Sequence, residues 1–456
     1  TGDGKLSLCS LMLPDTLVSI GNRAFRACRN LTGSLVIPEG VVDIQQGAFS
    51  ECNNLNGTLT LPSTLKKLGN CGNDKNQDTR DEENDYYGGV FQHCGFVGDL
   101  IIPDGVELIR GYCFECCEGF ETLRLPNSLK RMGTRAFAFC RGLKGSLDIP
   151  LGITNIPQDA FRECQFDGTL HLHDGITTIE SNAFSLNHFR GELILPKYLK
   201  TINNEAFRAN NFSGTLHLPK TLISIGNYAF SENKRISGIV DIPEGVVSIG
   251  EHAFEGCPMI EGLVIPESVE TIRKSAFSLC YGIGTVVCKG ILPPSVGDNA
   301  FDGVAKMCVL EVPESAVAQY TTAVKWREFK RITAHHELVC HPSVACALST
   351  EHKQTVVVYA EGEWEVSSKP EWCDVTPSSG KNKTEVTITI KAMNSSTGNR
   401  NGEVVFQLKE KNYTSTCRVS QCGYQYAEDE YLALQKATQG QRGGINIVVL
   451  GDGYNA

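Results

Sequence analysis

The chain has 456 residues, of which 41% are hydrophobic and 21% are charged, and its formal net charge is −10 at pH 7. This composition is typical of a folded protein with several buried cores, and the negative charge argues against a surface for nucleic acid or anionic lipid. No apolar run approaches the roughly 20 residues that a membrane-spanning helix needs, so we expect no membrane insertion by this chain.

The first three quarters of the chain repeat a short phrase, usually Ala-Phe, in which the phenylalanine occurs twelve times. Ten of the eleven intervals between successive copies are 23 or 24 residues. A fixed period of this length predicts a solenoid, in which each repeat is too small to bury its own apolar face and is covered by its neighbours. The recurring residues are Phe25, Phe49, Phe91, Phe114, Phe137, Phe161, Phe184, Phe207, Phe230, Phe254, Phe277 and Phe301.

Most repeats also contain a Leu-x-Ile/Leu-Pro sequence after the phenylalanine, as in the segment from Leu35 to Pro38. The first and third residues are apolar and the second is not required by the core, which is the alternation of a half-buried strand. The proline then ends the strand, because it cannot donate a backbone hydrogen bond to a neighbour. The pattern therefore predicts one strand per repeat.

The third position after the phenylalanine is cysteine in eight repeats and asparagine in three. Both side chains are small and can donate a hydrogen bond to the backbone of a turn, so we expect them to form a ladder along the solenoid. A disulfide framework or a metal site would need these residues to converge, whereas they lie one per repeat. They are Cys28, Cys52, Cys94, Cys117, Cys140, Cys164, Asn187, Asn210, Asn233, Cys257 and Cys280.

Together these features resemble a BspA-like leucine-rich repeat array over residues 1–333. The resemblance implies a right-handed α/β leucine-rich repeat solenoid with one strand in each 23–24-residue repeat. It also implies a closing cap with a short helix, to which Tyr320, Trp326 and Phe329 would belong. Members of this family are surface proteins of host-associated bacteria and some protists, and most are described as adhesins, which implies a host protein or glycan as partner.

One interval is longer than the others because an acidic segment, Asn70 to Tyr87, is inserted after a strand. Asp74, Asn76 and Asp78 occupy the first, third and fifth places of a calcium loop, but Thr79 stands where the sharp turn needs glycine. We therefore favour a solvated surface insertion over a calcium site.

The second strand position, two residues before the proline, points away from the core and is free to bind a partner. It is polar in the middle repeats and apolar toward both ends. His171, His173 and His217 could suggest a metal, but we expect none, because no carboxylate or thiolate is evident among them. We predict a ligand-binding face formed by Arg124, Asp148, His171, His217 and Asp241.

From residue 338 to 423 the repeat period is lost, and short alternating strands separated by Gly- and Ser-rich turns predict a β-sandwich. Trp364-Glu365-Val366, the run from Pro370 to Val375 and the closing Val419-Ser420-Gln421 resemble a BACON domain in order and spacing. The resemblance implies an all-β immunoglobulin-like sandwich that could bind carbohydrate. Trp364 and Trp372 lie inside strand patterns, so we favour core positions for them over sugar platforms.

Residues 424–456 contain an amphipathic linker helix and then an apolar strand that runs into Gly451-Asp452-Gly453-Tyr454. This strand resembles the first strand of the catalytic domain in IgA-peptidase-like zinc metallopeptidases, in which a helical HExxH supplies zinc ligands and the general base. No HExxH occurs in this sequence. We therefore predict no catalytic residues and no cofactor in this chain, with zinc only in a domain that would follow it.

The sequence begins within a repeat, with neither an initiator Met nor a signal peptide, so we expect a piece of a longer exported precursor. The leading interpretation is an extracellular or cell-surface bacterial recognition protein, whose solenoid binds a host protein or glycan and presents a downstream metallopeptidase. Two alternatives stay open. The sandwich could be the carbohydrate-binding module with the solenoid as its stalk, or the chain could belong to a secreted zinc peptidase whose catalytic residues lie beyond it.

Overall fold

The computed structural model describes residues 9–70, 88–304, 308–334, 338–341, 344–347, 351–360, 362–392, 400–409 and 413–421. Most of the acidic insertion, including its calcium-loop positions, lies outside these ranges. The segment 424–456, for which we predicted a linker helix and the first strand of a metallopeptidase domain, lies outside them as well. No helix in the described part of the chain is long and apolar enough to span a bilayer.

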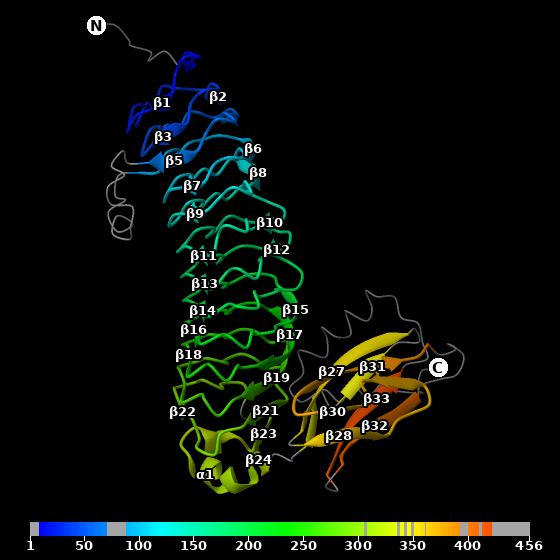
Figure 1. The fold of residues 1–456 in the computed structure, drawn as a ribbon. Coiled ribbons are helices and arrows are strands. Elements are labelled where there is room, and N and C mark those ends of the chain that lie inside the picture. Colours follow the sequence, from blue (N-terminus) through cyan, green and yellow to red (C-terminus); the bar gives the residue numbers. More distant parts are fainter. Residues whose placement is uncertain are drawn as a thin grey trace, which may run out of the picture.

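The repeats form an elongated solenoid of stacked turns, and a β-sandwich lies beside its C-terminal part (Figure 1). The strands of the solenoid pair in parallel with the equivalent strands of neighbouring turns. They form two separate ladders rather than the single ladder that the sequence predicted. The prediction of one strand per repeat is therefore wrong for most turns, because the isoleucine segment that precedes the Ala-Phe phrase also pairs.

Ladder A is the predicted one, and most of its strands belong to segments that end at a proline. In its two-residue strands the first side chain is buried and the second is exposed, as with Leu147 and Asp148. Its strands pair as β2-β4, β6-β8, β10-β12 and β15-β17-β19-β21-β23-β24. They are β2 (Leu35–Val36), β4 (Leu59–Thr60), β6 (Gly98–Ile101), β8 (Phe120–Arg124), β10 (Leu147–Asp148), β12 (Leu170–His171), β15 (Ser213–Thr215), β17 (Arg235–Asp241), β19 (Ile260–Ile265), β21 (Thr285–Cys288), β23 (Val309–Val312) and β24 (Arg331–Ala334).

Ladder B consists of a five-stranded and a seven-stranded parallel sheet. Most of its strands bury an isoleucine or another aliphatic residue at the second position, as at Ile156 and Ile179. They are β1 (Ser19–Ile20), β3 (Asp43–Gln45), β5 (Lys67–Asn70), β7 (Leu108–Ile109), β9 (Arg131–Met132), β11 (Asn155–Ile156), β13 (Thr178–Ile179), β14 (Thr201–Ile202), β16 (Ser224–Ile225), β18 (Ser248–Ile249), β20 (Thr271–Ile272) and β22 (Ser295–Val296).

The α/β class predicted for the solenoid is also wrong, because its turns contain almost no helix. Among the described residues the α-helix is α1 (Val317–Thr322), with short 3-10 helices η3 (Glu314–Ala316) and η4 (Trp326–Glu328) beside it. Around each phenylalanine the chain forms tight turns instead, and residues on either side adopt positive φ, such as 53° at Asp159 and 54° at Glu163. A residue with positive φ cannot continue a right-handed helix, so the segment is interrupted twice.

The recurring phenylalanines form a continuous stack inside the solenoid. The ring of Phe161 lies 5.5 Å from that of Phe137 and 5.7 Å from that of Phe184, with nearly parallel planes. The Cys/Asn ladder is confirmed: the Cys164 thiol donates to the carbonyl of Phe137 at 2.9 Å, and the Asn187 amide donates to the carbonyl of Phe161 at 2.8 Å. Each of these side chains thus joins its own turn to the previous one.

The predicted cap closes the C-terminal end of the solenoid around Tyr320, Trp326 and Phe329, all of which are buried. The indole ring of Trp326 lies 5.4 Å from Phe301, the last ring of the stack. Its Nε1 donates to the carbonyl of Pro294 at 2.8 Å, and the Tyr320 hydroxyl donates to the carbonyl of Gly290 at 3.0 Å. The aromatic stack is therefore covered without leaving these polar atoms unpaired.

The remaining strands form two sheets that pack face to face, which confirms a sandwich-like all-β region. One sheet has the order β25-β27-β31-β29 and the other β26-β33-β32-β28-β30. Trp364 lies fully buried between them, edge-on to Phe406 at 5.5 Å. The strands are β25 (Leu338–His341), β26 (Val344–Ala347), β27 (His352–Ala360), β28 (Glu363–Ser368), β29 (Cys373–Thr376), β30 (Ser379–Lys381), β31 (Thr384–Ile390), β32 (Arg400–Leu408) and β33 (Thr414–Gln421).

Candidate functional site

The outward side chains of ladder A form the candidate binding face. Arg124 ends β8, Asp148 ends β10 and His171 ends β12, so the three side chains occupy successive turns of the solenoid. Asp148 is the register partner of His171. All three are well exposed, because the alternation that buries Leu147 and Leu170 turns the next residue of each strand outward.

Asp148 and His171 of this face form a network of hydrogen bonds with neighbouring side chains. The carboxylate of Asp148 bonds to Nδ1 of His171, and Nε2 of His171 lies 3.0 Å from the hydroxyl of Thr169. The hydroxyl of Thr169 in turn lies 3.0 Å from that of Ser146. The expectation that no carboxylate lies among the histidines is therefore wrong, since Asp148 contacts one of them. The network fixes the orientation of the imidazole ring and leaves its edge open to solvent.

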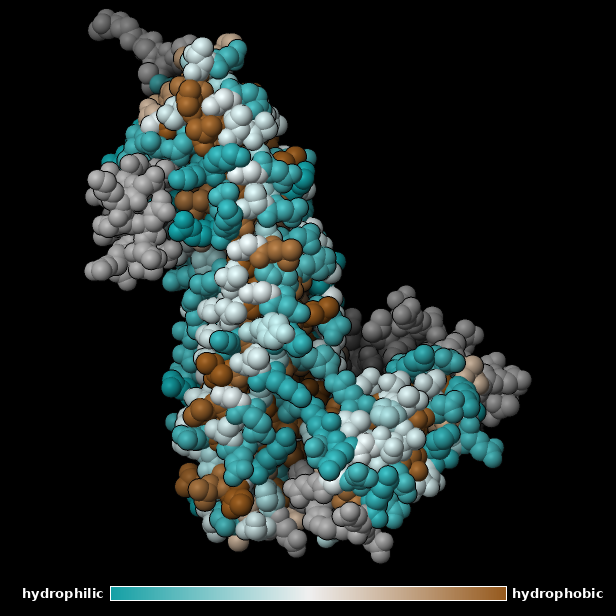
Figure 2. Space-filling view, in the orientation of Figure 1, coloured by the Kyte–Doolittle hydropathy of each residue, from teal (hydrophilic) through white to brown (hydrophobic). Residues whose placement is uncertain are grey.

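The other polar side chains of the predicted face have different surroundings. Arg124 lies 3.6 Å from Asp104, and this ion pair is largely exposed. His217 is exposed on a later turn of the solenoid. Ile194, on a turn between those of His171 and His217, is also exposed, and so is Ile101, on the turn before that of Arg124. Apolar side chains therefore border the polar row. On the face of the solenoid seen in Figure 2, hydrophobic residues (brown) are likewise scattered among hydrophilic ones (teal).

Asp241 does not belong to the open part of the face, because the sandwich covers it. Its carboxylate forms an ion pair with Lys383 of the sandwich. The next outward positions of ladder A, Val264 and Val287, are buried against the ring of Tyr359. The ladder therefore divides into an open part, which includes Arg124, Asp148, His171 and His217, and a part that carries the sandwich.

The apolar part of the contact between solenoid and sandwich is centred on one aromatic ring. Tyr359 of β27 packs on the outward valines, with Ile239 and Val357 at its edge. The ammonium group of Lys289 lies 5.7 Å from the centre of that ring. The Tyr359 hydroxyl is buried, and no described residue pairs with it. A buried hydroxyl that finds no partner costs about 1–3 kcal/mol, which would offset part of the gain from the apolar contact.

The side chains that could ligate a metal ion are dispersed in the described part of the chain. No group of three or more His, Cys, Asp or Glu side chains within them has the arrangement of a metal site. His173, which we considered as a ligand beside His171, instead bonds to the carbonyl of Pro150 and to the backbone N–H of Gly175. These two bonds use both of its ring nitrogens.

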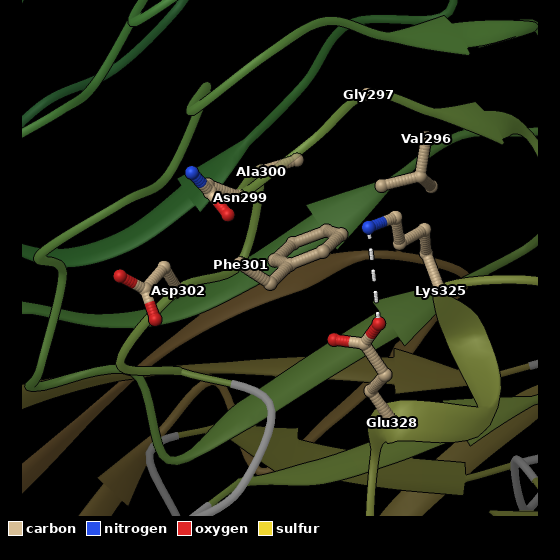
Figure 3. Close-up of a pocket in the computed structure, with 8 residues that line it drawn as sticks. All are labelled: Val296, Gly297, Asn299, Ala300, Phe301, Asp302, Lys325 and Glu328. Atoms are coloured by element: carbon tan, nitrogen blue, oxygen red, sulfur yellow. Dashed lines mark ion pairs between the residues drawn. The ribbon is translucent and has the colours of Figure 1, made fainter.

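A small pocket lies at the cap, between the last turn of ladder B and η4 (Figure 3). Its lining includes Asn299, Asp302, Lys325 and Glu328, with Phe301 at its floor. Lys325 lies 4.0 Å from Glu328 and 3.1 Å from Asp298. The volume of about 60 Å³ is far below the roughly 300 Å³ of a small-molecule site, so this pocket is not a candidate for a metabolite.

The tryptophans of the sandwich are poorly placed to bind sugar. Trp364 is completely buried, which confirms the predicted core position. Trp372 is half-buried, and the guanidinium group of Arg400 lies 4.5 Å above its ring. Arg400 is held there by the side chain of Gln421 at 2.8 Å and the carbonyl of Lys391 at 2.6 Å. One face of the Trp372 ring is thus already occupied by a fixed cation.

Two family models match the chain. A model described as a BspA type leucine-rich repeat region matches in six copies, over residues 3–74, 87–213 and 200–323. The BACON model, described as an N-terminal binding domain, matches residues 362–421. None of the curated proteins compared with the chain matches it. The two matched regions correspond to the solenoid and to most of the sandwich.

Several solved structures are similar to the chain. A leucine-rich repeat protein from Bacteroides ovatus is 22% identical, covers 70% of this chain and 88% of its own, and has a TM-score of 0.47. A leucine-rich cell surface protein from Faecalibacterium prausnitzii is 20% identical over 59% of this chain and 69% of its own, with a TM-score of 0.31. A xyloglucanase from Bacteroides ovatus is 25% identical over 19% of each chain, with a TM-score of 0.18.

Proposed function

Because the chain belongs to the BspA-type leucine-rich repeat family, we propose that it is an exported bacterial recognition protein that binds a host protein or glycan at the cell surface. The binding surface is the open part of ladder A, centred on Arg124, Asp148 and His171, with His217 farther along it. The similar protein from Faecalibacterium prausnitzii is a cell surface protein, which is consistent with this location. The proposal assigns no catalytic activity to the chain.

The observation that supports this surface best is the row of exposed polar side chains on successive turns. Stacking places them at the spacing of parallel strands, ~4.8 Å, which gives an extended surface rather than an enclosed pocket. Exposed Ile101 and Ile194 border the row, and they could bury apolar area against a partner. An extended surface of mixed polarity suits a protein or an oligosaccharide better than a small metabolite.

In this proposal the sandwich is a spacer that is docked on the solenoid. The alternative, that the sandwich binds carbohydrate and the solenoid is a stalk, is favoured by the description of the BACON family as a binding domain. The contacts of its tryptophans argue against it, since Trp364 is buried and Arg400 covers one face of Trp372. We therefore place recognition on the solenoid.

The test compares two triple variants of the full chain against an array of host matrix proteins and mucin glycans. The first variant replaces the open row of ladder A, as Arg124→Ala, Asp148→Ala and His171→Ala. The matched control replaces the residues seven positions later, on ladder B of the same turns, as Arg131→Ala, Asn155→Ala and Thr178→Ala. Circular dichroism establishes that both variants remain folded.

The expected result is a loss of affinity of at least about tenfold for the ladder A variant and unchanged binding for the ladder B variant. Equal loss in both variants, or full binding by the ladder A variant, would contradict the proposed surface. A Trp372→Ala variant separates the alternative. If it alone abolishes binding to glycans, the sandwich is the recognition module and the solenoid is its stalk.

A further inference from the structure

Two cysteines of the sandwich meet between its sheets. Cys340 lies in β25, at the outer edge of one sheet, and Cys417 lies in β33 of the other sheet. Both side chains point inward and are buried, Cys340 with 2% of its surface exposed and Cys417 with none. The two strands are also joined at this level by a hydrogen bond of 2.8 Å from the backbone N–H of Cys340 to the hydroxyl of Ser415.

The two thiol groups are in direct contact. A hydrogen bond links the side chain of Cys417 to that of Cys340, and together with burial it raises the pKa of Cys340 well above its ordinary value. The ladder cysteines of the solenoid from Cys52 onward are arranged differently, because each of these thiols donates to a phenylalanine carbonyl of the previous turn, as Cys140 does to Phe114 at 3.0 Å. Only a pair of converging side chains satisfies the short sulfur–sulfur geometry of a disulfide.

We propose that Cys340 and Cys417 are a site of disulfide formation, which joins the first strand of the sandwich to its last. The bond would form by exchange with a low-molecular-weight disulfide or a protein disulfide oxidant. The thiolate of one cysteine attacks the oxidant, which gives a mixed disulfide and releases one thiol. The second cysteine then attacks the mixed disulfide, the bond between Cys340 and Cys417 forms, and the second thiol of the oxidant leaves with the proton.

The position of β25 makes this reaction accessible although both thiols are buried. As an edge strand it pairs only with β27 within its sheet, so local opening exposes Cys340 without unfolding the rest of the sandwich. The loop that the bond closes, from residue 340 to residue 417, includes nearly the whole sandwich. Closing a long loop restricts the unfolded chain strongly, so the oxidised sandwich should be the more stable form.

The proposed disulfide does not depend on which ligand the solenoid binds. Such bonds persist in oxidising compartments outside the cytoplasm. The test starts with the reduced full chain in a glutathione redox buffer, followed by alkylation of the remaining thiols and peptide mapping without reduction. The expected product is one cross-linked peptide pair containing Cys340 and Cys417, with an intact mass lower by about 2 Da before alkylation. Its formation should raise the melting temperature of the sandwich.

Matched variants identify the pair. The Cys373→Ser variant, which changes another buried cysteine of the sandwich, should retain the cross-link, whereas Cys417→Ser should lose it and the gain in melting temperature. The wild-type map decides the question even if a variant does not fold. The proposal is overturned if Cys340 and Cys417 are both recovered alkylated after exposed Cys9 has become glutathionylated, or if either is linked to a different cysteine.

Discussion

Phe161 provides a direct test of the idea that the aromatic stack holds the solenoid together. Its side chain is completely buried, between the rings of Phe137 and Phe184, and the edge of Phe166 approaches it at 6.4 Å. The Phe161→Ala substitution removes the ring and leaves a cavity that neighbouring turns cannot fill, because their backbones are fixed by the two parallel ladders. The change therefore interrupts the stack in the middle of the solenoid.

The expected cost in the free energy of unfolding is about 3–5 kcal/mol, the usual range for truncating a buried phenylalanine. Part of it comes from the two stacking contacts, which contribute about 0.5–1.5 kcal/mol each beyond the buried area. Because each turn contacts only its neighbours, the loss is concentrated at two interfaces, between the Phe137 and Phe161 turns and between the Phe161 and Phe184 turns. The solenoid can then unfold in two parts rather than one.

Urea denaturation followed by circular dichroism measures the effect, and Phe139→Ala is the matched control. Phe139 lies two residues after Phe137 but is only partly buried and outside the stack, so its loss should cost well under half as much. A lower midpoint for Phe161→Ala, with a broadened or biphasic transition, is the expected result. If both variants shift the midpoint equally, the stack is not the main source of stability and the two ladders are.

Two further predictions concern the thiol ladder and the contact between the domains. Burial raises the pKa of the Cys280 thiol to about 12, whereas a thiol in the unfolded chain has a pKa of about 8.5. At a pH between these two pKa values, Cys280 keeps its proton in the native state and loses it in the unfolded state. Stability should therefore be complete below about pH 8.5 and fall above it, by about 1.4 kcal/mol per pH unit for each such cysteine, and Cys280→Asn should reduce this slope in urea titrations at pH 8 and 10. Replacing Tyr359 by Ser should release the sandwich from the solenoid, which small-angle X-ray scattering would record as a larger radius of gyration. Tyr359→Phe, which keeps the ring and removes a hydroxyl that no described residue pairs with, should retain the contact. A Tyr198→Ser control on the exposed solenoid surface should leave the radius unchanged, and an unchanged radius for Tyr359→Ser would mean that other contacts hold the domains.

The repeat period predicted the features that depend on one turn and its neighbours. The stack through Phe161, the ladder through Cys164 and Asn187, and the outward position of His171 all follow from residues that recur at the same place in each repeat. The cap around Trp326 was predictable because its aromatic residues must cover the last exposed ring. In a solenoid such features require no knowledge of distant contacts.

The incorrect predictions concern backbone conformations and long-range contacts that cannot be recognised from the residue types. Asp159 and Glu163 adopt a left-handed conformation although neither is glycine, so their residue types did not indicate that the segment between them forms turns rather than a helix. The covering of Asp241 depends on Lys383, which lies 142 residues later and belongs to a region with no repeat relation to it. Strand alternation predicts that a side chain points away from the core, but it cannot show whether the sandwich covers that side chain.

The strand pairing of the sandwich also has a mechanical consequence. Beyond β25, the next strand, β26, lies parallel to the last strand, β33, with Val344 opposite Arg418 and Ala347 opposite Gln421. While Cys340 and Cys417 are reduced, and once β25 has separated from β27, a force that pulls the solenoid away from the chain after β33 acts on the start of β26 and on the end of β33, so the two strands are drawn past each other along their length. All the evenly spaced hydrogen bonds between them then bear the load together instead of breaking one after another. Resistance to such shear is set by the barrier to unfolding rather than by equilibrium stability, which makes the sandwich suited to transmit tension between the solenoid and whatever follows it.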